Sequence, residues 1–210
     1  MLWRTSRTSI PRPGFIEPCV PTRSDKVPDG PMWIHEIKHD GYRLIIRRVE
    51  DRVRLFTRRG FDWTDRFPRI VEGAKRLKAR AFILDGEAVI CGADGVADFA
   101  KLHSRAYEDD VILFAFDLLE LNGQELRKEP TETRKGKLEK LLSRTRSDIY
   151  FTEHLDADGA LMFKHACKMG LEGIVSKRRD APYRPGRCKS WLKIKNPKSP
   201  AMMRVEDGTF

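Results

Sequence analysis

Hydrophobic and polar positions change their spacing several times along this chain, and each spacing indicates a different element. Some segments alternate apolar with polar residues or form short apolar runs, which predicts β-strands. Others repeat apolar residues at helical spacing. The predicted strands cover residues 33–37, 42–46, 53–57, 81–91, 111–121, 149–152, 171–178 and 190–195. The predicted helices cover residues 67–77, 99–105, 131–144 and 158–169.

The order of these elements predicts the fold class and the domain organisation. Strands and helices are mixed without a strict β-α-β rhythm, which predicts an α+β fold with largely antiparallel sheets. Residues 1–31 are proline-rich and lack periodicity, so we expect an extended, partly disordered lead-in. Residues 32–196 form a single domain. Residues 197–210 contain two further prolines near their start and are predicted to be a linker.

Composition and charge restrict the class of protein and the kind of partner. The 210 residues are 40% hydrophobic and 34% charged, and the formal net charge is +10, which favours an anionic partner, nucleic acid first. Nine Lys or Arg residues and one acid lie between residues 177 and 198. Such a segment attracts a phosphate backbone. The 4 cysteines lack metal-site spacing, which predicts free thiols in a reducing cytoplasm. No apolar run reaches the roughly 20 residues of a membrane span, so we expect no membrane partner.

The first candidate for chemistry is Lys38, which follows an apolar run and precedes the turn-forming pair Asp40 and Gly41. The period of two in a strand puts Glu36 and Lys38 side by side on one face. A lysine nucleophile must be neutral, and free lysine has a pKa of about 10.4. Burial and nearby cations such as Arg43 disfavour the ammonium form. The alternative is a hairpin with a surface lysine beside its turn.

Three further residues interrupt the pattern of the predicted strands. Arg58 precedes a glycine at a strand end, where the backbone can approach a ligand; a surface arginine at a hairpin is the alternative. Glu87 lies in an apolar strand, where an unpaired charge is costly. A bulge that turns Glu87 to solvent explains it equally well. Phe116 is placed where a ring can stack on a base, although core packing is the commoner use of such a ring.

A carboxylate and three lysines stand out near the end of the chain. Glu172 begins a predicted strand, and its oxygens suit Mg²⁺. Lys177 ends the same strand, and simple alternation places it on the face opposite Glu172. Both reach one pocket only if the strand bends or bulges. Lys193 and Lys195 share one strand face, which suits a phosphate chain or, alternatively, a solvated strand edge.

Each feature is weak alone, but their order along the chain is informative. The motifs are Lys38-His39-Asp40-Gly41, Thr57-Arg58-Arg59-Gly60, Leu84-Asp85-Gly86-Glu87, Phe116-Asp117-Leu118-Leu119, Glu172-Gly173-Ile174-Val175-Ser176-Lys177 and Trp191-Leu192-Lys193-Ile194-Lys195. This series resembles the adenylation (nucleotidyltransferase) domain of ATP-dependent DNA ligases, most closely the bacterial ligases of end-joining repair. The resemblance implies an ATP-grasp-like nucleotidyltransferase core of antiparallel sheets flanked by helices.

The resemblance also implies a reaction, used in DNA repair and recombination. A lysine, here Lys38, attacks the α-phosphorus of ATP to form lysyl-AMP and releases pyrophosphate. AMP then passes to the 5′-phosphate of a nick, and the 3′-hydroxyl displaces it. The implied cofactors are ATP and Mg²⁺ (or Mn²⁺), and the implied partner is nicked or broken double-stranded DNA. The expected location is the cytoplasm of a bacterium, at the nucleoid.

By the same match, five residues are expected to bind the nucleoside or the nucleic acid. Glu36 would read the exocyclic amine of adenine, and Phe116 would stack on the adenine ring. Arg43 and Arg58 would hold the ribose and phosphates or the nicked end. Glu87 would meet the ribose.

The remaining matched residues are expected to bind the metal and the phosphates. Glu172 would bind the catalytic metal, with Glu87 as a second carboxylate. Lys177, Lys193 and Lys195 would contact phosphates, and their charge would favour a neutral Lys38.

One departure from the family concerns the end of the sequence. Family members continue beyond the last lysine motif into an OB-fold domain, whereas the residues that remain here are too few for such a barrel. We therefore expect an adenylation domain that needs a separately encoded OB-fold or end-joining partner, or a truncated gene product with weak activity. The alternatives are an RNA ligase or capping-type nucleotidyltransferase, and a non-catalytic ligase fragment that grips DNA.

Overall fold

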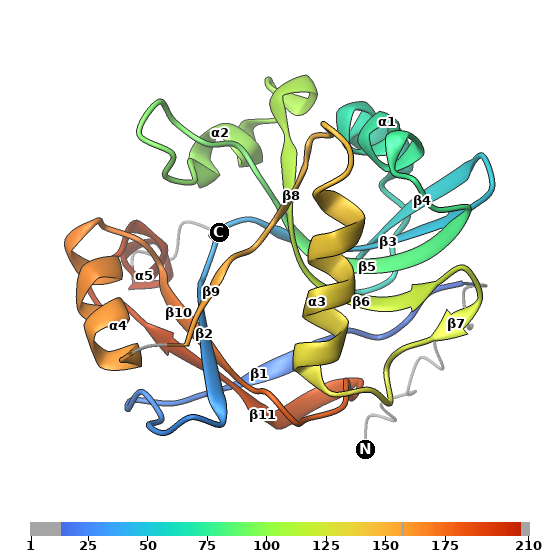
Figure 1. Cartoon of the computed structure of the whole chain (residues 1–210). Coiled ribbons are helices and arrows are strands. Elements are labelled where there is room, and N and C mark those ends of the chain that lie inside the picture. Colours follow the sequence, from blue (N-terminus) through green and yellow to red (C-terminus); the bar gives the residue numbers. More distant parts are fainter. Residues whose placement is uncertain (1–13, 157, 207–210) are drawn as a thin grey trace, which may run out of the picture.

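In the computed structural model, residues 14–156 and 158–206 are described, and they form two sheets with flanking helices (Figure 1). The strands are β1 (Cys19–Arg23), β2 (Trp33–Ile37), β3 (Tyr42–Val49), β4 (Arg52–Thr57), β5 (Ala81–Val89), β6 (Ile112–Leu121), β7 (Gln124–Glu125), β8 (Ile149–Phe151), β9 (His154–Leu155), β10 (Gly173–Arg178) and β11 (Gly186–Lys195). The helices are α1 (Pro68–Arg76), α2 (Phe99–Ser104), α3 (Thr131–Leu142), α4 (Gly159–Lys168) and α5 (Pro200–Glu206), with short 3-10 turns at Thr64–Arg66 and Glu108–Asp110. The predicted α+β class is confirmed.

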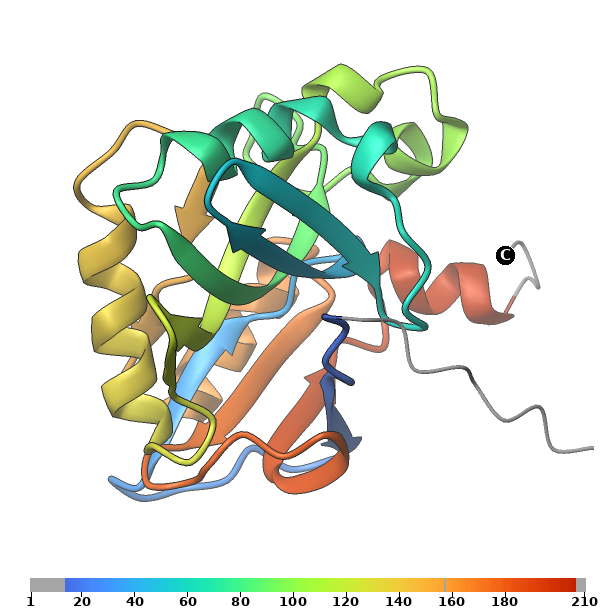
Figure 2. The same ribbon diagram turned by 90° about the vertical axis from the view of Figure 1, so that its right-hand side faces the viewer.

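The two sheets have different strand orders and face one another. The five-stranded sheet has the order β1-β11-β10-β2-β9, and the six-stranded sheet has the order β4-β3-β5-β6-β7, with β8 beside β6. Their pairing is antiparallel except for β1 with β11 and β6 with β8. Figure 2 shows the sheets as two layers, with the β3–β4 hairpin above the orange strands β10 and β11.

The chain passes from one sheet to the other directly after β2. The Lys38 N–H donates to the Gly173 carbonyl at 3.0 Å, which extends the alignment of β2 with β10. A Cβ atom on Gly41 would lie 2.1 Å from the Ala88 carbonyl oxygen, so only glycine fits this close approach. Strands β2 and β3 therefore belong to different sheets, and the hairpin alternative for Asp40 and Gly41 is wrong.

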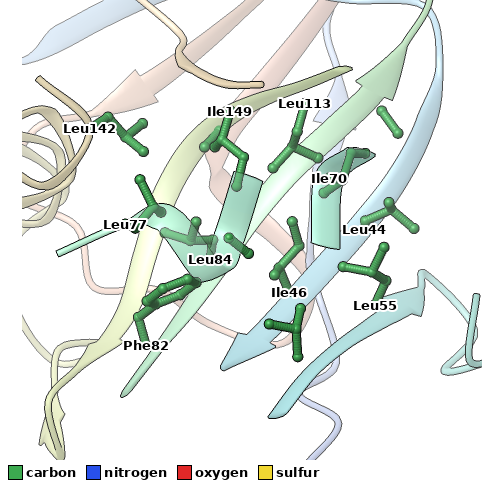
Figure 3. Close-up of a cluster of buried hydrophobic side chains, with 14 of the residues drawn as sticks. Leu44, Ile46, Leu55, Ile70, Leu77, Phe82, Leu84, Leu113, Leu142 and Ile149 are labelled. Atoms are coloured by element: carbon green, nitrogen blue, oxygen red, sulfur yellow. The ribbon is translucent and has the colours of Figure 1, made fainter. Parts of the chain in front are cut away.

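Three apolar clusters hold the layers together. The largest lies between the six-stranded sheet and helices α1 and α3, and Figure 3 shows part of it, including Leu44, Leu84 and Leu113. A second cluster joins the two sheets through Phe56, Phe116 and Trp191 among others. The third packs α4 on the five-stranded sheet. The second cluster closes one end of the space between the sheets, next to Lys38.

Besides the short strands β7 and β9, which were not expected, three segments differ from the expectation. Residues 19–23, expected within an extended lead-in, form the edge strand β1, an edge being the position that tolerates Pro21. Parallel pairing with β1 also starts β11 at Gly186, earlier than predicted. The predicted linker contains α5, because Pro200 opens a helix in which the Ser199 carbonyl accepts from the Met202 N–H at 2.9 Å.

The rest of the lead-in expectation, for residues 1–13, lies outside the described residues, as does the linker expectation for residues 207–210. The helices of the described chain are all too short or too polar to cross a membrane.

Candidate active site

Lys38 lies between the two sheets, where it borders two cavities. The smaller has a volume of about 170 Å³. The predicted site residues that line it are Glu36, Lys38, Arg43, Arg58, Glu87, Phe116, Lys177 and Lys193. The larger, of about 830 Å³, lies on the other flank of Lys38 and includes Glu172 and residues of α2 and α5. The remaining predicted residue, Lys195, lines neither cavity and pairs with Glu172 at the larger one.

The side chain of Lys38 forms an ion pair with Glu172. The distance from Lys38 Nζ to Glu172 Oε2 is 2.5 Å, and Lys195 Nζ lies 3.1 Å from the other carboxylate oxygen. Gly173 has a φ of 136°, outside the regular strand region, and a Cβ atom there would lie 2.1 Å from the Ile194 carbonyl oxygen. Glu172 lines the larger cavity and Lys177 the smaller one, and β10 pairs with β2 and β11 without a register shift. The two side chains therefore do not share one pocket, and the bend or bulge that sharing would require is not present within β10.

Glu36 lies in the wall of the smaller cavity with both carboxylate oxygens paired. Lys135 Nζ lies 2.7 Å from Oε1 and Lys177 Nζ lies 2.6 Å from Oε2, and all three side chains are buried. Burial would raise the pKa of Glu36, but the two ammonium groups more than offset burial and hold that pKa below its usual value. Burial lowers the pKa of Lys177 in spite of its pairing with Glu36. Glu36 is thus an ionised hydrogen-bond acceptor whose position is fixed by the ammonium groups of Lys135 and Lys177.

Arg43 is held by a buried carboxylate at the opposite wall of the cavity. Its guanidinium donates to Asp85 through Nε at 2.7 Å and through Nη2 at 2.6 Å. The Tyr183 hydroxyl donates to the same carboxylate at 2.6 Å and accepts from the Cys19 N–H at 2.9 Å. Such bidentate pairing fixes the plane of the guanidinium. A charged residue within the apolar strand β5 therefore has a structural reason, since Asp85 orients Arg43.

Phe116 is both a core residue and a cavity residue. Its ring belongs to the cluster between the sheets, with 9% of its surface exposed. The Arg43 guanidinium lies 4.8 Å from the ring centroid, and Lys177 Nζ lies 4.5 Å from it. The core alternative for this ring is confirmed, and Phe116 also lines the smaller cavity, while its stacking on a base stays a prediction.

Glu87 faces the cavity and not bulk solvent. A register irregularity in β5 does occur between Asp85 and Gly86, but Glu87 is half-buried and lines the smaller cavity, so the alternative in which a bulge turns it to solvent is wrong. Burial, together with Glu172 and Asp85, raises the pKa of Glu87 to about 7 against the opposing effect of Lys38 and Arg43. A cation bound between Glu87 and Glu172 would stabilise the ionised form of Glu87.

Arg58 and Lys193 add positive charge at the mouth of the cavity. Arg58 is exposed at the end of β4 and still lines the cavity. Burial lowers the pKa of Lys193, and the neighbouring charges of Lys195, Lys38 and Arg58 act in the same direction. Strand β11 lies between β1 and β10, so the solvated-edge alternative for Lys193 and Lys195 is wrong.

The carboxylates of the site fit a hard divalent cation that also contacts a substrate. Among the described residues, no group of three or more His, Cys, Asp or Glu side chains has the geometry of a closed metal site. Glu87 and Glu172 are the acidic residues at Lys38, and the charge of Glu172 raises the pKa of Glu87. Mg²⁺ is commonly held by one or two carboxylates together with waters and substrate phosphates.

Sequence reasoning missed Lys135, which lies on α3 and contacts Glu36. Its neighbour Arg134 is fully buried and donates to Asp117 from Nε at 2.7 Å. The sequence does indicate the pair of Arg134 with Asp117, because a buried carboxylate within an apolar strand requires a cation. Lys135 carried no such signal, because its partner comes from a distant strand.

Comparison with known proteins places this geometry in a family. A model of the ATP dependent DNA ligase domain matches residues 22–195. The multifunctional non-homologous end joining protein LigD of Pseudomonas aeruginosa is 36% identical over 189 residues, covering 88% of this chain and 22% of that protein. The chain thus spans about a fifth of the length of the LigD relatives it matches.

Solved structures give the same assignment. The ligase domain of Mycobacterium tuberculosis LigD has a TM-score of 0.75 and 35% identity, over 85% of this chain and 58% of that one. A mycobacterial DNA ligase D complexed with ATP and MES has a TM-score of 0.72 and 34% identity, over 85% of this chain and 59% of that one. The nucleotidyltransferase core expected from the sequence is confirmed. The chain belongs to the family of ATP-dependent DNA ligase domains.

Proposed function

We propose that this chain binds ATP and forms a covalent lysyl-AMP at Lys38, for transfer to the 5′-phosphate of nicked DNA in strand repair. The observation that carries this proposal is the position of Lys38, whose side chain borders the cavity lined by Glu36, Phe116 and Lys193. The LigD relatives, which are named for non-homologous end joining, support a role in DNA repair. The proposed place of action is the cytoplasm, at the chromosome.

In this proposal Lys38 must leave its ion pair with Glu172 before it reacts. An ammonium held at 2.5 Å by a carboxylate has no free lone pair, so Nζ becomes a nucleophile only once it is released and deprotonated. Nζ then forms a bond to the α-phosphorus while the bond from that phosphorus to the bridging oxygen breaks, and pyrophosphate leaves. The positive side chains around the cavity stabilise the charge that develops on the phosphate oxygens.

The walls of the cavity supply the proposed nucleotide contacts. Phe116 offers its ring to the base, and Glu36, although paired with two lysines, keeps lone pairs that can accept from an exocyclic amine. Arg43, which is fixed by Asp85, and Glu87 both line the cavity, and their proposed partners are the ribose and phosphate groups. Lys193 and Arg58 carry charge for the phosphate chain. Positioning and charge neutralisation are what phosphoryl-type transfer chiefly requires.

Glu172 and Glu87 are the proposed holders of Mg²⁺ (or Mn²⁺). A bound divalent cation supplies neutralisation of the phosphate charge during the transfer. The competition of Lys38 and Lys195 for Glu172 links metal occupancy to the state of the nucleophile.

Nicked or broken double-stranded DNA is the proposed second substrate. The exposed side chains of Arg184, just before β11, and of Arg187 and Lys189, in the first part of β11, offer phosphate contacts. Complete sealing is proposed to require an OB-fold domain or an end-joining partner, supplied in the same chain or separately.

The test is covalent labelling with ATP that carries a radioactive α-phosphate, in the presence of Mg²⁺. The wild-type chain should acquire a label that survives denaturation, and Lys38→Ala and Lys38→Arg should not. Lys140→Arg, on the exposed face of α3, is the matched control and should label like the wild type. A stable label on Lys38→Ala would contradict the assignment. Preferential labelling from GTP would favour the capping-type alternative.

Adding a nicked duplex to the labelled protein tests the second step. Transfer of label to the DNA 5′ end, with or without a supplied OB-fold domain, is expected. Transfer to an RNA nick alone would favour an RNA ligase instead.

A further inference from the structure

Two cysteines that the proposed chemistry does not use lie against one another between β1 and β11. The sulfur atoms of Cys19 and Cys188 are 2.7 Å apart, and both residues are buried. Strand β1 is at the edge of its sheet and pairs only with β11, in a parallel register that places Pro21 opposite Cys188. The two thiols are thus held together by strand pairing across 169 positions of sequence.

A surface cavity borders one of these two cysteines. Cys188 lines a surface cavity of about 470 Å³, together with the basic side chains of Arg178, Arg184, Arg187 and Lys189. A basic cavity of this kind favours entry of a small anion. Cys91 and Cys167 are not among its lining residues.

Position divides the roles of the two thiols. Their sulfur atoms share one hydrogen bond in which either can be the donor. Cys188 borders the cavity, whereas Cys19 is not among the cavity's lining residues. Donors from Ser190 and Trp191 also act to lower the pKa of Cys188, which favours its thiolate, the reactive form.

We infer that Cys19 and Cys188 form a reversible disulfide by exchange with a small anionic disulfide that enters the basic cavity. The Cys188 thiolate attacks one sulfur of that molecule, forms a mixed disulfide and releases a small thiol. The Cys19 sulfur then loses its proton, attacks Cys188 Sγ and releases the second small thiol. The two protein thiols are oxidised by two electrons, and the small disulfide is reduced to two thiols.

The bond would join two strands that line the cavity beside Lys38. Strand β1 contributes Val20 and Pro21 to that cavity, and β11 contributes Trp191 and Lys193. The disulfide would tie the edge strand to its neighbour and so fix this wall. The inference requires nothing of the proposed nucleotide chemistry, and its test needs no enzymatic readout.

The test uses oxidised glutathione as the probe, on the full chain. After acid quenching and unfolding, the wild type should show two reactive thiols of its 4 cysteines and the loss of two hydrogen masses, and digestion should give one peptide pair joined through Cys19 and Cys188. Reduction with dithiothreitol should restore all the thiols. Four reactive thiols after oxidation, or a bond that includes Cys91 or Cys167, would overturn the inference.

Variants separate the pair from the other cysteines. The double variant Cys91→Ser/Cys167→Ser should oxidise like the wild type, and Cys19→Ala should stop at glutathione bound to Cys188. Because the bond closes a long loop, the Tm of the oxidised double variant should exceed that of its reduced form by about 5 °C or more. An unchanged Tm with a fully formed bond would overturn the claim that the bond fixes β1.

Discussion

Glu36 and Lys135 lie 99 positions apart along the chain, and their side chains form a buried ion pair with 2.7 Å between Oε1 and Nζ. Lys177 pairs with the other oxygen, so one buried carboxylate neutralises part of the charge of two buried lysines. Lys135 also donates to the Thr152 carbonyl at 2.9 Å. The cluster joins α3 to β2, to β10 and to the backbone between β8 and β9, and Glu36 and Lys177 line the cavity beside Lys38.

The asymmetry of this cluster predicts an order of stabilities. Glu36→Gln removes the one negative charge and leaves two buried ammonium groups, so it should lower the free energy of unfolding by about 3–5 kcal/mol. Lys135→Met leaves Glu36 paired with Lys177 and should cost less, about 1–2 kcal/mol. Urea denaturation measures both.

The control for this order is Lys140→Met, on the same helix but exposed, which should change the stability by less than about 0.5 kcal/mol. A Lys135→Met variant less stable than Glu36→Gln would show that Lys135, and not the carboxylate, holds the cluster together.

Local patterns predicted much of this fold because the burial of each strand and helix repeats over a few residues. The β3–β4 hairpin, α1 and α3 follow from such periodicity. The site residues were also recognisable in sequence, because charged residues in apolar strands or at strand ends need a reason. Their shared cavity is a geometric finding; their roles in nucleotide binding stay predictions.

The features that the sequence did not predict depend on residues that are far away along the chain. Strand β1 contains Pro21 and has little periodicity, and it exists because β11 offers a parallel edge. Lys135 lies on α3 and its partner Glu36 lies in β2, and the local sequence pattern of α3 does not indicate this contact. The crossing between sheets after Lys38 likewise depends on pairing with β10, which comes much later in the chain.

Glu87 predicts a pH dependence of stability. Its pKa of about 7 in the folded chain lies above the usual 4.5, so the folded state holds this proton more tightly than the unfolded state does. As the pH rises through this window, Glu87 therefore contributes progressively less stability, and above about pH 7 it carries a penalty of about 2–3 kcal/mol. Glu87→Gln should be more stable than the wild type at about pH 8 and similar to it at about pH 5, by urea denaturation.

The exposed carboxylate Glu153 provides the control, since Glu153→Gln should follow the wild type at both pH values. Equal stabilities of Glu87→Gln and the wild type at about pH 8 would mean that the ionised side chain meets no penalty in the folded chain.

Glu172 predicts how labelling depends on metal. Chelation with EDTA should abolish the covalent label, and excess Mg²⁺ should restore it. Glu172→Gln removes one of the two proposed metal carboxylates, so it should slow labelling by about 100-fold or more and raise the Mg²⁺ concentration for half-maximal rate. Its fold should persist, because Lys38 and Lys195 are each partly exposed, with 22% and 23% of the side chain accessible.

Glu139→Gln, an exposed carboxylate on α3, should label at the wild-type rate. A Glu172→Gln variant with a normal rate and normal Mg²⁺ dependence would exclude Glu172 as a metal ligand.

The basic segment 184–189, at the start of β11, predicts a salt-dependent contact with DNA. Its exposed side chains are Arg184, Arg187 and Lys189, and β11 also lines the cavity beside Lys38. Each phosphate contact contributes about 0.9 to the slope of log K against log salt, so replacing all three by Ala should weaken binding to a nicked duplex and reduce the slope by up to about 2.7. Fluorescence anisotropy at several salt concentrations measures both quantities. The charge-matched control replaces Lys140, Lys164 and Lys168, exposed on α3 and α4, and should keep the wild-type slope. If the control lowers the slope as much as the triple variant of the basic segment does, binding depends on net charge alone and this segment is not the DNA contact.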